Sequence, residues 1–309
     1  MSNSEFTRRS LLASAAALPI AAAGGQMAHA AAPMMGAGMS SYNRVGLGGF
    51  EVTTILAGTM PRPDPHTIFG LNVSEDAFAK ASAEARIPTD KAQFFFTPTV
   101  INTGAELVLF DTGLNAEATT AALAQAGYTP DQIDIVVITH MHGDHIGGLM
   151  NGDAPTFPNA RYITGSVEFD AWAAMENDGF ESKMRPLAEQ TTMIGDGDSV
   201  APGITAMAAF GHTPGHMTYM IESEGQRLLV AADFANHYVW SLGYPDWEVK
   251  FDMDKAAAAK ARRRVLDMLA ADGIPFIGYH MPWPGMGYVE AQGDGFRYVP
   301  TSYQLMMQG

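Results

Sequence analysis

Short apolar segments bounded by turn residues alternate with helical patterns along most of the chain. The most apolar of them, residues 133–138 (Ile-Asp-Ile-Val-Val-Ile), predicts a buried strand. Further strands are expected at 50–56, 94–102, 106–111, 161–164, 204–208, 217–221, 227–232 and 275–279. Helices are expected at 75–85, 117–126, 166–175 and 255–271, whereas the Pro-rich segment 60–67 predicts a loop.

The signals at the ends of these segments support the assignments. Ser74 precedes the first helix as an N-cap, and Asp252 or Asp254 precedes the last one, which Gly273 ends. The order is strands, helix, strand, helix, and then the same again. It predicts an α/β fold in which two sheets pack face to face with helices outside, a four-layer αβ/βα sandwich. We expect residues 42–309 to form this single domain.

The composition of the chain limits the class of protein, the partners and the metal donors to be expected. The chain has 309 residues, 47% hydrophobic and 17% charged, which is typical of a globular protein with an ample core. The net charge of -15 argues against nucleic acid as a partner. Because there are no cysteines, a metal site would have to use nitrogen and oxygen donors.

The N-terminal segment is typical of an export signal. Arg8 and Arg9 precede an apolar Ala-rich stretch, and Ala28-His29-Ala30 matches a cleavage site. The paired arginines predict a twin-arginine signal peptide at 1–30, with general secretion as the alternative. Residues 31–41 are expected to form a flexible leader. We expect a periplasmic mature protein without a membrane segment.

Ligand-type side chains crowd the end of the predicted strand 133–138. His140, His142, Asp144 and His145 fall within six residues. Ligands at the carboxyl end of a buried strand lie in the usual crevice of layered α/β proteins. Imidazoles with a carboxylate suit zinc and similar divalent metals. The alternative interpretation is a solvated His-rich turn.

These residues resemble a known signature. The run Thr139–Gly148 resembles the H-x-H-x-D-H motif of the metallo-β-lactamase superfamily, and the segment 211–216 (GHTPGH) resembles its second His motif. Asp233 and His280 end strands where that family places a bridging carboxylate and a last His. The resemblance implies one metal held by His140, His142 and His212, a second held by Asp144, His145 and His280, and Asp233 bridging the two.

The resemblance also implies a chemistry. Two divalent ions, Zn²⁺ above all but also Mn, Co or Fe, would share a hydroxide that attacks a substrate carbonyl. Asp144, Asp233 and His216 would be the catalytic side chains, with His216 beside the ligands rather than on the metal. Asp111 is expected to orient a ligand His, or to form an Asx-turn. His66 and His237 lie outside these motifs and are expected to be structural, although His237 could line a pocket.

The C-terminal segment 278–287 (GYHMPWPGMG) resembles the methyl parathion hydrolase-like branch, whose members are lactonases, arylesterases and organophosphate hydrolases. The chain departs from the organophosphate enzymes because Leu114-Asn115 leads almost directly from 111–113 into a helix. We therefore expect a hydrolase of small neutral esters or lactones, with phosphotriester hydrolysis as a weak side activity. The expected substrate pocket contains Phe169, Trp172, Phe180, Asn236 and Trp283.

Several alternatives remain open at this stage. The substrate could be an N-acyl-homoserine lactone, or the enzyme could be a methyl parathion-type organophosphate hydrolase. An iron-dependent sulfur dioxygenase and a non-catalytic binding protein are more distant alternatives. Relatives in this branch are often dimers, so the resemblance implies a homodimer as a partner state.

Overall fold

The computed structural model describes residues 36 and 38–303, and the expected signal peptide 1–30 and most of the expected leader lie outside them. Gly36, Gly38 and Met39 have no regular secondary structure, and the residues from Ser40 onward form one compact unit. No helix among the described residues is long and apolar enough to cross a membrane. Export and the cleavage site stay predictions.

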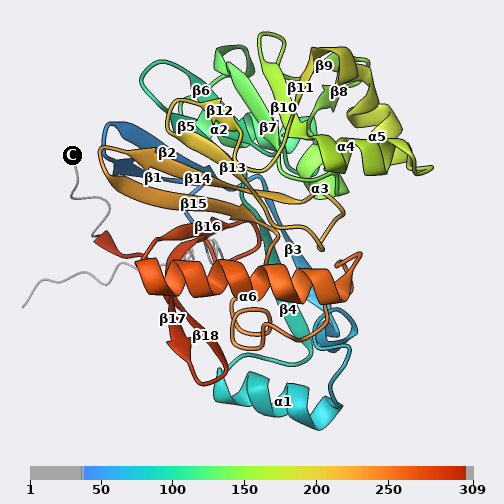
Figure 1. Cartoon of the computed structure of the whole chain (residues 1–309), viewed down its shortest axis with the longest axis vertical. Helices are drawn as coiled ribbons and strands as arrows, with labels where there is room; N and C mark the ends of the chain where they lie inside the picture. The colour runs from blue at the N-terminus through green and yellow to red at the C-terminus, as the bar shows by residue number, and fades with distance from the viewer. Residues whose placement is uncertain (1–35, 37, 304–309) are drawn as a thin grey trace, which may run out of the picture. The chain divides into compact units, whose positions relative to one another are not determined.

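Two seven-stranded sheets form the centre of this unit (Figure 1). The first runs in the order β1 (Tyr42–Leu47), β2 (Phe50–Ile55), β5 (Thr99–Asn102), β6 (Leu107–Phe110), β7 (Ile135–Ile138), β10 (Arg161–Gly165) and β11 (Thr191–Ile194). The second runs in the order β12 (Ser199–Ala201), β13 (Ile204–Ala208), β14 (Met217–Ser223), β15 (Gln226–Ala232), β16 (Phe276–Gly278), β17 (Met286–Gln292) and β18 (Gly295–Pro300). Two small ribbons pair β3 (Gly58–Pro63) with β4 (Lys91–Phe96) and β8 (Met150–Asn151) with β9 (Ala154–Pro155).

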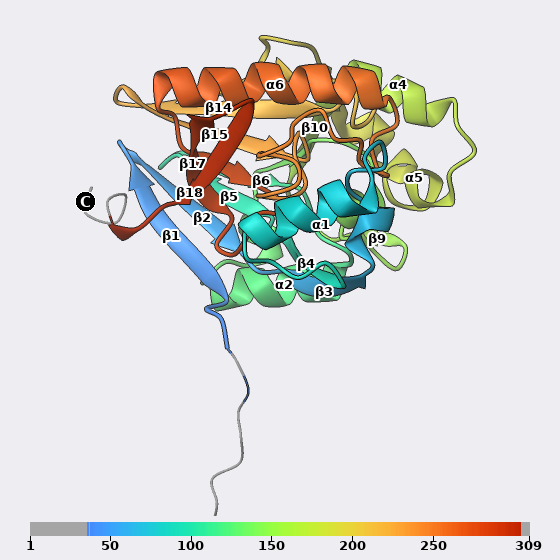
Figure 2. The same ribbon diagram turned by 90° about the horizontal axis from the view of Figure 1, so that it is seen from below.

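Helices cover the outer faces of the sheets. Figure 2 shows α6 and α2 on opposite sides, with strands of both sheets between them. The α-helices are α1 (Glu75–Glu84), α2 (Ala116–Gln125), α3 (Gly143–Ile146), α4 (Ser166–Ala173), α5 (Asp178–Lys183) and α6 (Lys255–Asp272). The short 3₁₀ turns are η1 (Pro65–Thr67), η2 (Pro130–Gln132) and η3 (Arg185–Gln190).

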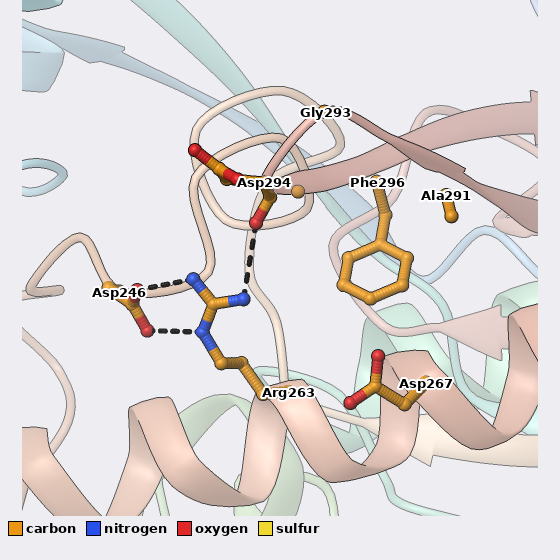
Figure 3. A pocket seen from close by; sticks show the side chains of 8 residues that line it. Asp246, Arg263, Asp267, Ala291, Gly293, Asp294 and Phe296 are labelled. Carbon is orange, nitrogen blue, oxygen red and sulfur yellow. Dashed lines mark hydrogen bonds and ion pairs between the residues drawn. The ribbon is translucent and has the colours of Figure 1, made fainter.

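Helix α6 is held at its start and along its exposed side. Asp254 accepts a hydrogen bond from the Ala257 N–H as N-cap, and Gly273 ends the helix in the left-handed conformation. On the exposed side, Arg263 pairs with the Asp246 carboxylate and donates to the Asp294 carbonyl (Figure 3). These contacts tie the helix to the turn between β17 and β18. The polar hollow that they border is lined by none of the predicted ligands.

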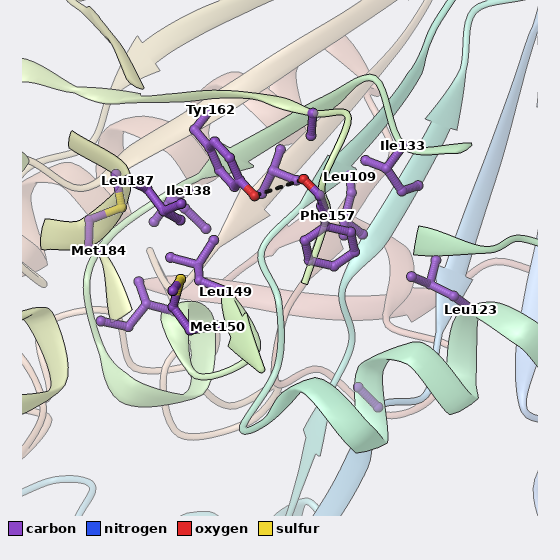
Figure 4. Close-up of a cluster of buried hydrophobic side chains, with 14 of the residues drawn as sticks. Leu109, Leu123, Ile133, Ile138, Leu149, Met150, Phe157, Tyr162, Met184 and Leu187 are labelled. Atoms are coloured by element: carbon purple, nitrogen blue, oxygen red, sulfur yellow. Dashed lines mark hydrogen bonds between the residues drawn. The ribbon is translucent and has the colours of Figure 1, made fainter. Parts of the chain in front are cut away.

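Alternating strand residues build three apolar layers. Ile135 and Val137 of β7 pack toward the second sheet, where Leu228 and Val230 of β15 belong to the same buried cluster. Their neighbours point the other way. Val136 and Ile138 join α2, α4 and α5 side chains, including Leu123, Phe169 and Phe180. Figure 4 shows Ile138 and Leu123 of this cluster. Leu229 and Ala231 pack on α6. The four-layer αβ/βα sandwich expected from the sequence is therefore confirmed.

Two segments differ from their predicted elements. Residues 60–67 do not form a loop, because 58–63 pair as a strand with β4. Pro61 and Pro63 are tolerated there since β3 has a neighbour on one side only. Residues 94–102 do not form one strand, because the chain breaks at Thr97-Pro98 and passes from β4 to β5. Because of this break, β4 pairs with β3 in a separate ribbon and not with the strands of the first large sheet.

The glycines after the ligand run set how closely α3 approaches its neighbours. A Cβ on Gly147 would lie 2.2 Å from the Leu114 carbonyl oxygen, and one on Gly148 would lie 2.0 Å from the Thr112 carbonyl oxygen. Real Cβ atoms do not approach backbone so closely. The small residues therefore bring the ligand-bearing turn against the segment that follows β6.

We expect Gly148→Ala to lower the free energy of unfolding by about 3 kcal/mol, because the new methyl group forces two backbone segments apart. Gly143→Ala is the matched control, since a Cβ there meets nothing within 4 Å. It should change the free energy by less than about 1 kcal/mol. Urea unfolding of both variants checks this, and equal effects at the two positions would contradict the close-packing argument.

Candidate metal centre

Loops at one edge of the two sheets bring all seven predicted ligands together. His140 and His142 follow β7, and Asp144 and His145 lie in α3. The remaining three follow strands or loops of the second sheet, namely His212 between β13 and β14, Asp233 after β15 and His280 after β16. Their side chains form three overlapping groups that could each hold a metal ion. Coordination itself stays a prediction.

The first group consists of three imidazoles. His142 Nδ1 lies 3.1 Å from His140 Nε2 and 3.0 Å from His212 Nε2. Two ligands about 2.1 Å from a tetrahedral metal are about 3.4 Å apart, so these nitrogens have nearly the required spacing. One divalent ion therefore fits between them.

A second group, formed by Asp144, His145 and His280, lies beside the first, and Asp233 approaches imidazoles of both. His280 Nε2 is 3.3 Å from Asp144 Oδ2, and His145 Nε2 is 3.7 Å from the same oxygen. Asp233 Oδ2 is 3.1 Å from His280 Nε2 and 3.4 Å from His212 Nε2, and its Oδ1 is 3.4 Å from His145 Nε2. The Asp233 carboxylate thus reaches imidazoles of both groups.

Hydrogen bonds fix the outer ring nitrogens of His140, His145 and His280, which leaves their inner nitrogens free to bind a cation. Nδ1 of His145 contacts Asp111 Oδ2 at 2.8 Å, and Nδ1 of His280 donates to the Phe95 carbonyl at 2.8 Å. Nδ1 of His140 contacts the Thr139 hydroxyl, which itself donates to Asp111. Such outer partners fix the tautomer and orientation of ligand imidazoles. The role expected for Asp111 as an orienting carboxylate is confirmed in its geometry.

His212 is oriented by a buried ion pair. Its Nδ1 lies 2.9 Å from Asp252 Oδ1, and Asp252 Oδ2 accepts a hydrogen bond of 2.7 Å from Arg262. Arg262 is fully buried on α6 and also donates to the Phe234 and Pro245 carbonyls. Helix α6 therefore acts on the centre through Asp252, whose alternative prediction as a helix cap is wrong.

Two buried polar atoms at the centre are arranged so that a metal ion would satisfy both. His145 Nε2 and Asp233 Oδ1 face one another, and both are buried without a hydrogen-bond partner in the part of the chain that the structure describes. A buried polar group without a partner is costly, and a shared cation would satisfy both atoms. The donor set of imidazole and carboxylate suits zinc and related divalent ions. The residues present therefore fit the metals that the sequence predicts.

Burial and neighbouring charges divide the histidines into two classes. Burial and the adjacent His212 lower the pKa of His142 to about 3, which keeps this ring neutral as a ligand must be. Burial also acts to lower the pKa of His280, but the carboxylates of Asp233 and Asp144 outweigh it and raise this pKa to about 10. The second group thus has a strong local preference for a positive charge, whether a proton or a metal ion.

His216 and Asn236 support Asp233 rather than joining the ligands. The Asp233 backbone N–H donates to His216 Nε2 at 3.1 Å, and the Asn236 amide donates to Asp233 Oδ2 at 2.9 Å. His216 belongs to none of the three ligand groups. Ala232, just before Asp233, has a positive φ of 47°, so the strand ends in a strained turn that aims the carboxylate.

Glu168 connects the two His motifs and was not predicted from the sequence. It is fully buried on α4, and its Oε1 accepts a hydrogen bond of 2.9 Å from the Met141 N–H. Its Oε2 accepts from the Thr213 hydroxyl at 2.7 Å and from the Gly215 N–H at 2.8 Å. Met141 lies between two ligands of the first motif, and Thr213 follows His212 in the second. The carboxylate therefore fixes the loops that carry the three-imidazole group.

A cavity of about 290 Å³ opens onto the centre. Four ligand residues line it together with an apolar wall of Phe94, Phe96, Leu114 and Phe251, and with the exposed guanidinium of Arg62. The site can therefore hold a small molecule with an apolar part against the predicted metals.

The residues expected to line the substrate pocket lie elsewhere. Phe169 and Phe180 pack into the core between the first sheet and its helices, and Trp172 contacts His142 from that side. Asn236 is buried beside Asp233, and Trp283 donates to the Ser40 hydroxyl. The aromatic wall comes instead from Phe94 and Phe96 of the β3–β4 ribbon, which was predicted in part as a loop, and from Phe251 before α6.

Comparison with known proteins agrees with this geometry. The sequence model of the metallo-beta-lactamase superfamily matches residues 97–273, more than half of the chain. The chain belongs to the metallo-β-lactamase superfamily. The four-layer sandwich and the five-histidine, two-aspartate cluster are thus features of a superfamily member.

Three individual proteins that match this chain share only 20–32% sequence identity with it over the aligned residues. An N-acyl homoserine lactonase, AiiA of Bacillus thuringiensis subsp. kurstaki, is 32% identical over 102 residues, which is 33% of this chain and only 38% of that protein. AidC, described as a dizinc quorum-quenching lactonase, has a TM-score of 0.80 at 22% identity, over 86% of this chain and 99% of that one. The hydrolase AbOPH also has a TM-score of 0.80, at 20% identity, over 87% and 100% of the two chains. At these identities the structural matches show the shared fold.

We expect Glu168→Gln to weaken zinc binding by about 10- to 100-fold, because an amide cannot accept hydrogen bonds on both sides and loosens the two ligand loops. Asp170→Asn, an exposed change in the same helix, is the control and should leave the affinity unchanged. Competition with a chromophoric chelator measures the dissociation constant, and urea unfolding measures stability in parallel. Lower stability with unchanged zinc affinity would show that Glu168 supports only the fold.

Proposed function

We propose that the protein is a dinuclear metal-dependent hydrolase that opens lactones and cleaves small neutral esters. The observation that carries this proposal is the placement of two ligand groups around Asp233, directly beside a cavity with an apolar wall. One group alone would suit a mononuclear site. Two complete groups that share a carboxylate match the requirement of a two-metal hydrolytic centre.

The reaction adds water across the acyl C–O bond. The acyl carbon gains a hydroxyl group and becomes a carboxylic acid, and the leaving oxygen gains a proton and becomes an alcohol. When bound, two divalent cations supply Lewis acidity and lower the pKa of water, so that a nucleophile is available near neutral pH. No side-chain nucleophile is needed, which is consistent with a chain that has no cysteine.

The protein's own residues orient the substrate and handle the proton. Phe94, Phe96 and Phe251 hold the apolar part, and Arg62 at the rim can donate a hydrogen bond to a carbonyl or carboxylate oxygen. Asp144 lines the cavity with 22% of its side chain exposed. Burial acts to raise the pKa of this carboxyl group, but His145 and His280 outweigh it and lower the pKa to about 2, so the group is ionised near neutral pH. Its carboxylate can therefore accept a proton from water and pass it to the leaving oxygen. Tyr279 fixes this turn because its hydroxyl donates to the Asp144 carbonyl at 2.6 Å.

Similar proteins support lactones as the preferred substrates. The named activity of AiiA and the dizinc lactonase description of AidC both point in that direction. The cavity supports a neutral substrate with an apolar group, as in an N-acyl homoserine lactone or an aromatic lactone. We propose phosphotriester hydrolysis only as a weaker activity, because the short segment after Gly113 contributes a single wall residue, Leu114.

We expect the zinc-loaded protein to hydrolyse lactones with a kcat/KM at least about tenfold above that for an aryl phosphotriester. An N-acyl homoserine lactone, dihydrocoumarin, phenyl acetate and a diethyl aryl phosphate make up the panel. His142→Ala, which removes the nitrogen shared by the first ligand group, is the inactive control. A preference for the phosphotriester would contradict the lactonase proposal. Hydrolysis of none of the four, or sulfur oxidation with one bound iron, would overturn the proposal as a whole.

We expect Phe251→Ala to lower kcat/KM for a long-chain acyl lactone by about tenfold, because the substrate loses one apolar wall of its cavity. The effect on a short lactone should be smaller. Trp283→Phe is the control, since Trp283 does not line this cavity. Steady-state kinetics of both variants against both lactones gives the comparison, and a larger effect at position 283 would contradict the pocket assignment.

A further inference from the structure

A second cavity lies behind His280, separate from the cavity of the metal centre. It has a volume of about 380 Å³. His280 is the one residue that lines both cavities. Its Nε2 faces Asp144 and Asp233, whereas its Nδ1 donates to the Phe95 carbonyl. The second cavity therefore contacts the back of a predicted ligand without reaching the metals.

The wall of this cavity is mostly apolar. It includes Ile87, Pro88, Phe95, Trp240 and Pro282. The exposed side chain of Lys91 also belongs to the wall. A concave apolar site of this size with a few well-placed polar groups is typical of small-molecule binding sites.

His237 supplies a fixed hydrogen-bond donor in this cavity. Its Nδ1 accepts hydrogen bonds from the backbone N–H groups of Val239 and Trp240, at 3.1 and 3.2 Å, so the ring proton must be on Nε2. The residue is only 8% exposed, and its ring stacks on Trp240 with centroids 3.9 Å apart. Nε2 makes no hydrogen bond among the described residues, and His237 lines the cavity.

The charge state of His237 determines which kind of small molecule can bind in this cavity. Burial lowers its pKa to about 3, so the ring is a neutral donor at physiological pH. A neutral N–H pairs with an uncharged acceptor such as a carbonyl or ether oxygen and gives little attraction to an anion. The metal-centre cavity differs, because its surroundings attract a positive charge.

We propose that this cavity is a second small-molecule site, which binds an uncharged, largely apolar compound through an oxygen that accepts a hydrogen bond from His237 Nε2. The site is distinct from the hydrolytic centre and does not depend on the activity proposed for it. Because the cavity lies behind His280, a compound bound there would contact this predicted metal ligand from outside the reaction cavity.

Acetophenone is a suitable probe, and ethylbenzene is its matched analogue without the carbonyl oxygen. We expect the zinc-loaded full chain to bind acetophenone about three- to tenfold more tightly than ethylbenzene, and the His237 Nε2 resonance of ¹⁵N-histidine-labelled protein to shift on titration. This second readout requires no variant to fold. An unshifted resonance at saturation, or equal affinity for the two probes, would overturn the proposal.

Two substitutions at position 237 separate the donor from the rest of the ring. His237→Asn keeps an acceptor for the two backbone N–H groups but loses the distant donor, so we expect it to abolish the preference for acetophenone. His237→Gln places an amide N–H near the position of Nε2 and should retain part of it. Leu114→Trp narrows only the metal-centre cavity and should leave binding unchanged. Binding lost in Leu114→Trp and retained in His237→Asn would place the probe at the metal centre and contradict the proposal.

Discussion

The buried Asp233 carboxylate is the constraint on which the rest of the structure depends. It lies within 3.5 Å of imidazole nitrogens of His145, His212 and His280, which come from three separate segments of the chain. A charge in the interior is costly unless it is paired, so this carboxylate requires a positive partner at the point where the loops meet. A proton on His280 or a divalent ion between the rings would each meet that requirement, and the nearly correct spacing of the inner nitrogens favours the ion.

The sandwich holds this arrangement from several layers at once. Asp111 reaches the centre from the first sheet, Asp252 and Arg262 from the region of α6, and Glu168 from α4. Each acts on a different ligand or loop. Because these supports come from separate elements, the geometry of the centre depends on the packing of the whole domain, including the close approach of Gly148 to β6.

Much of the centre could be predicted from the sequence because its ligands follow strands in recognisable motifs. His140 and His142 follow an unmistakably buried strand, and the four-layer order follows from the alternation of strands and helices. Glu168 was missed, although its i,i+4 spacing to Trp172 places it on the buried face of α4 and signals a buried charge. The cavity wall could not be predicted, because Phe94 and Phe96 acquire their place only when β4 leaves the sheet to pair with β3.

The most direct test of the account is anomalous diffraction at the zinc absorption edge from crystals of the zinc-loaded protein. We predict two peaks about 3.5 Å apart, one among His140, His142 and His212 and the other among Asp144, His145 and His280, with Asp233 between them. A single peak, or zinc bound outside these residues, would contradict the two-metal centre on which the proposed hydrolysis rests.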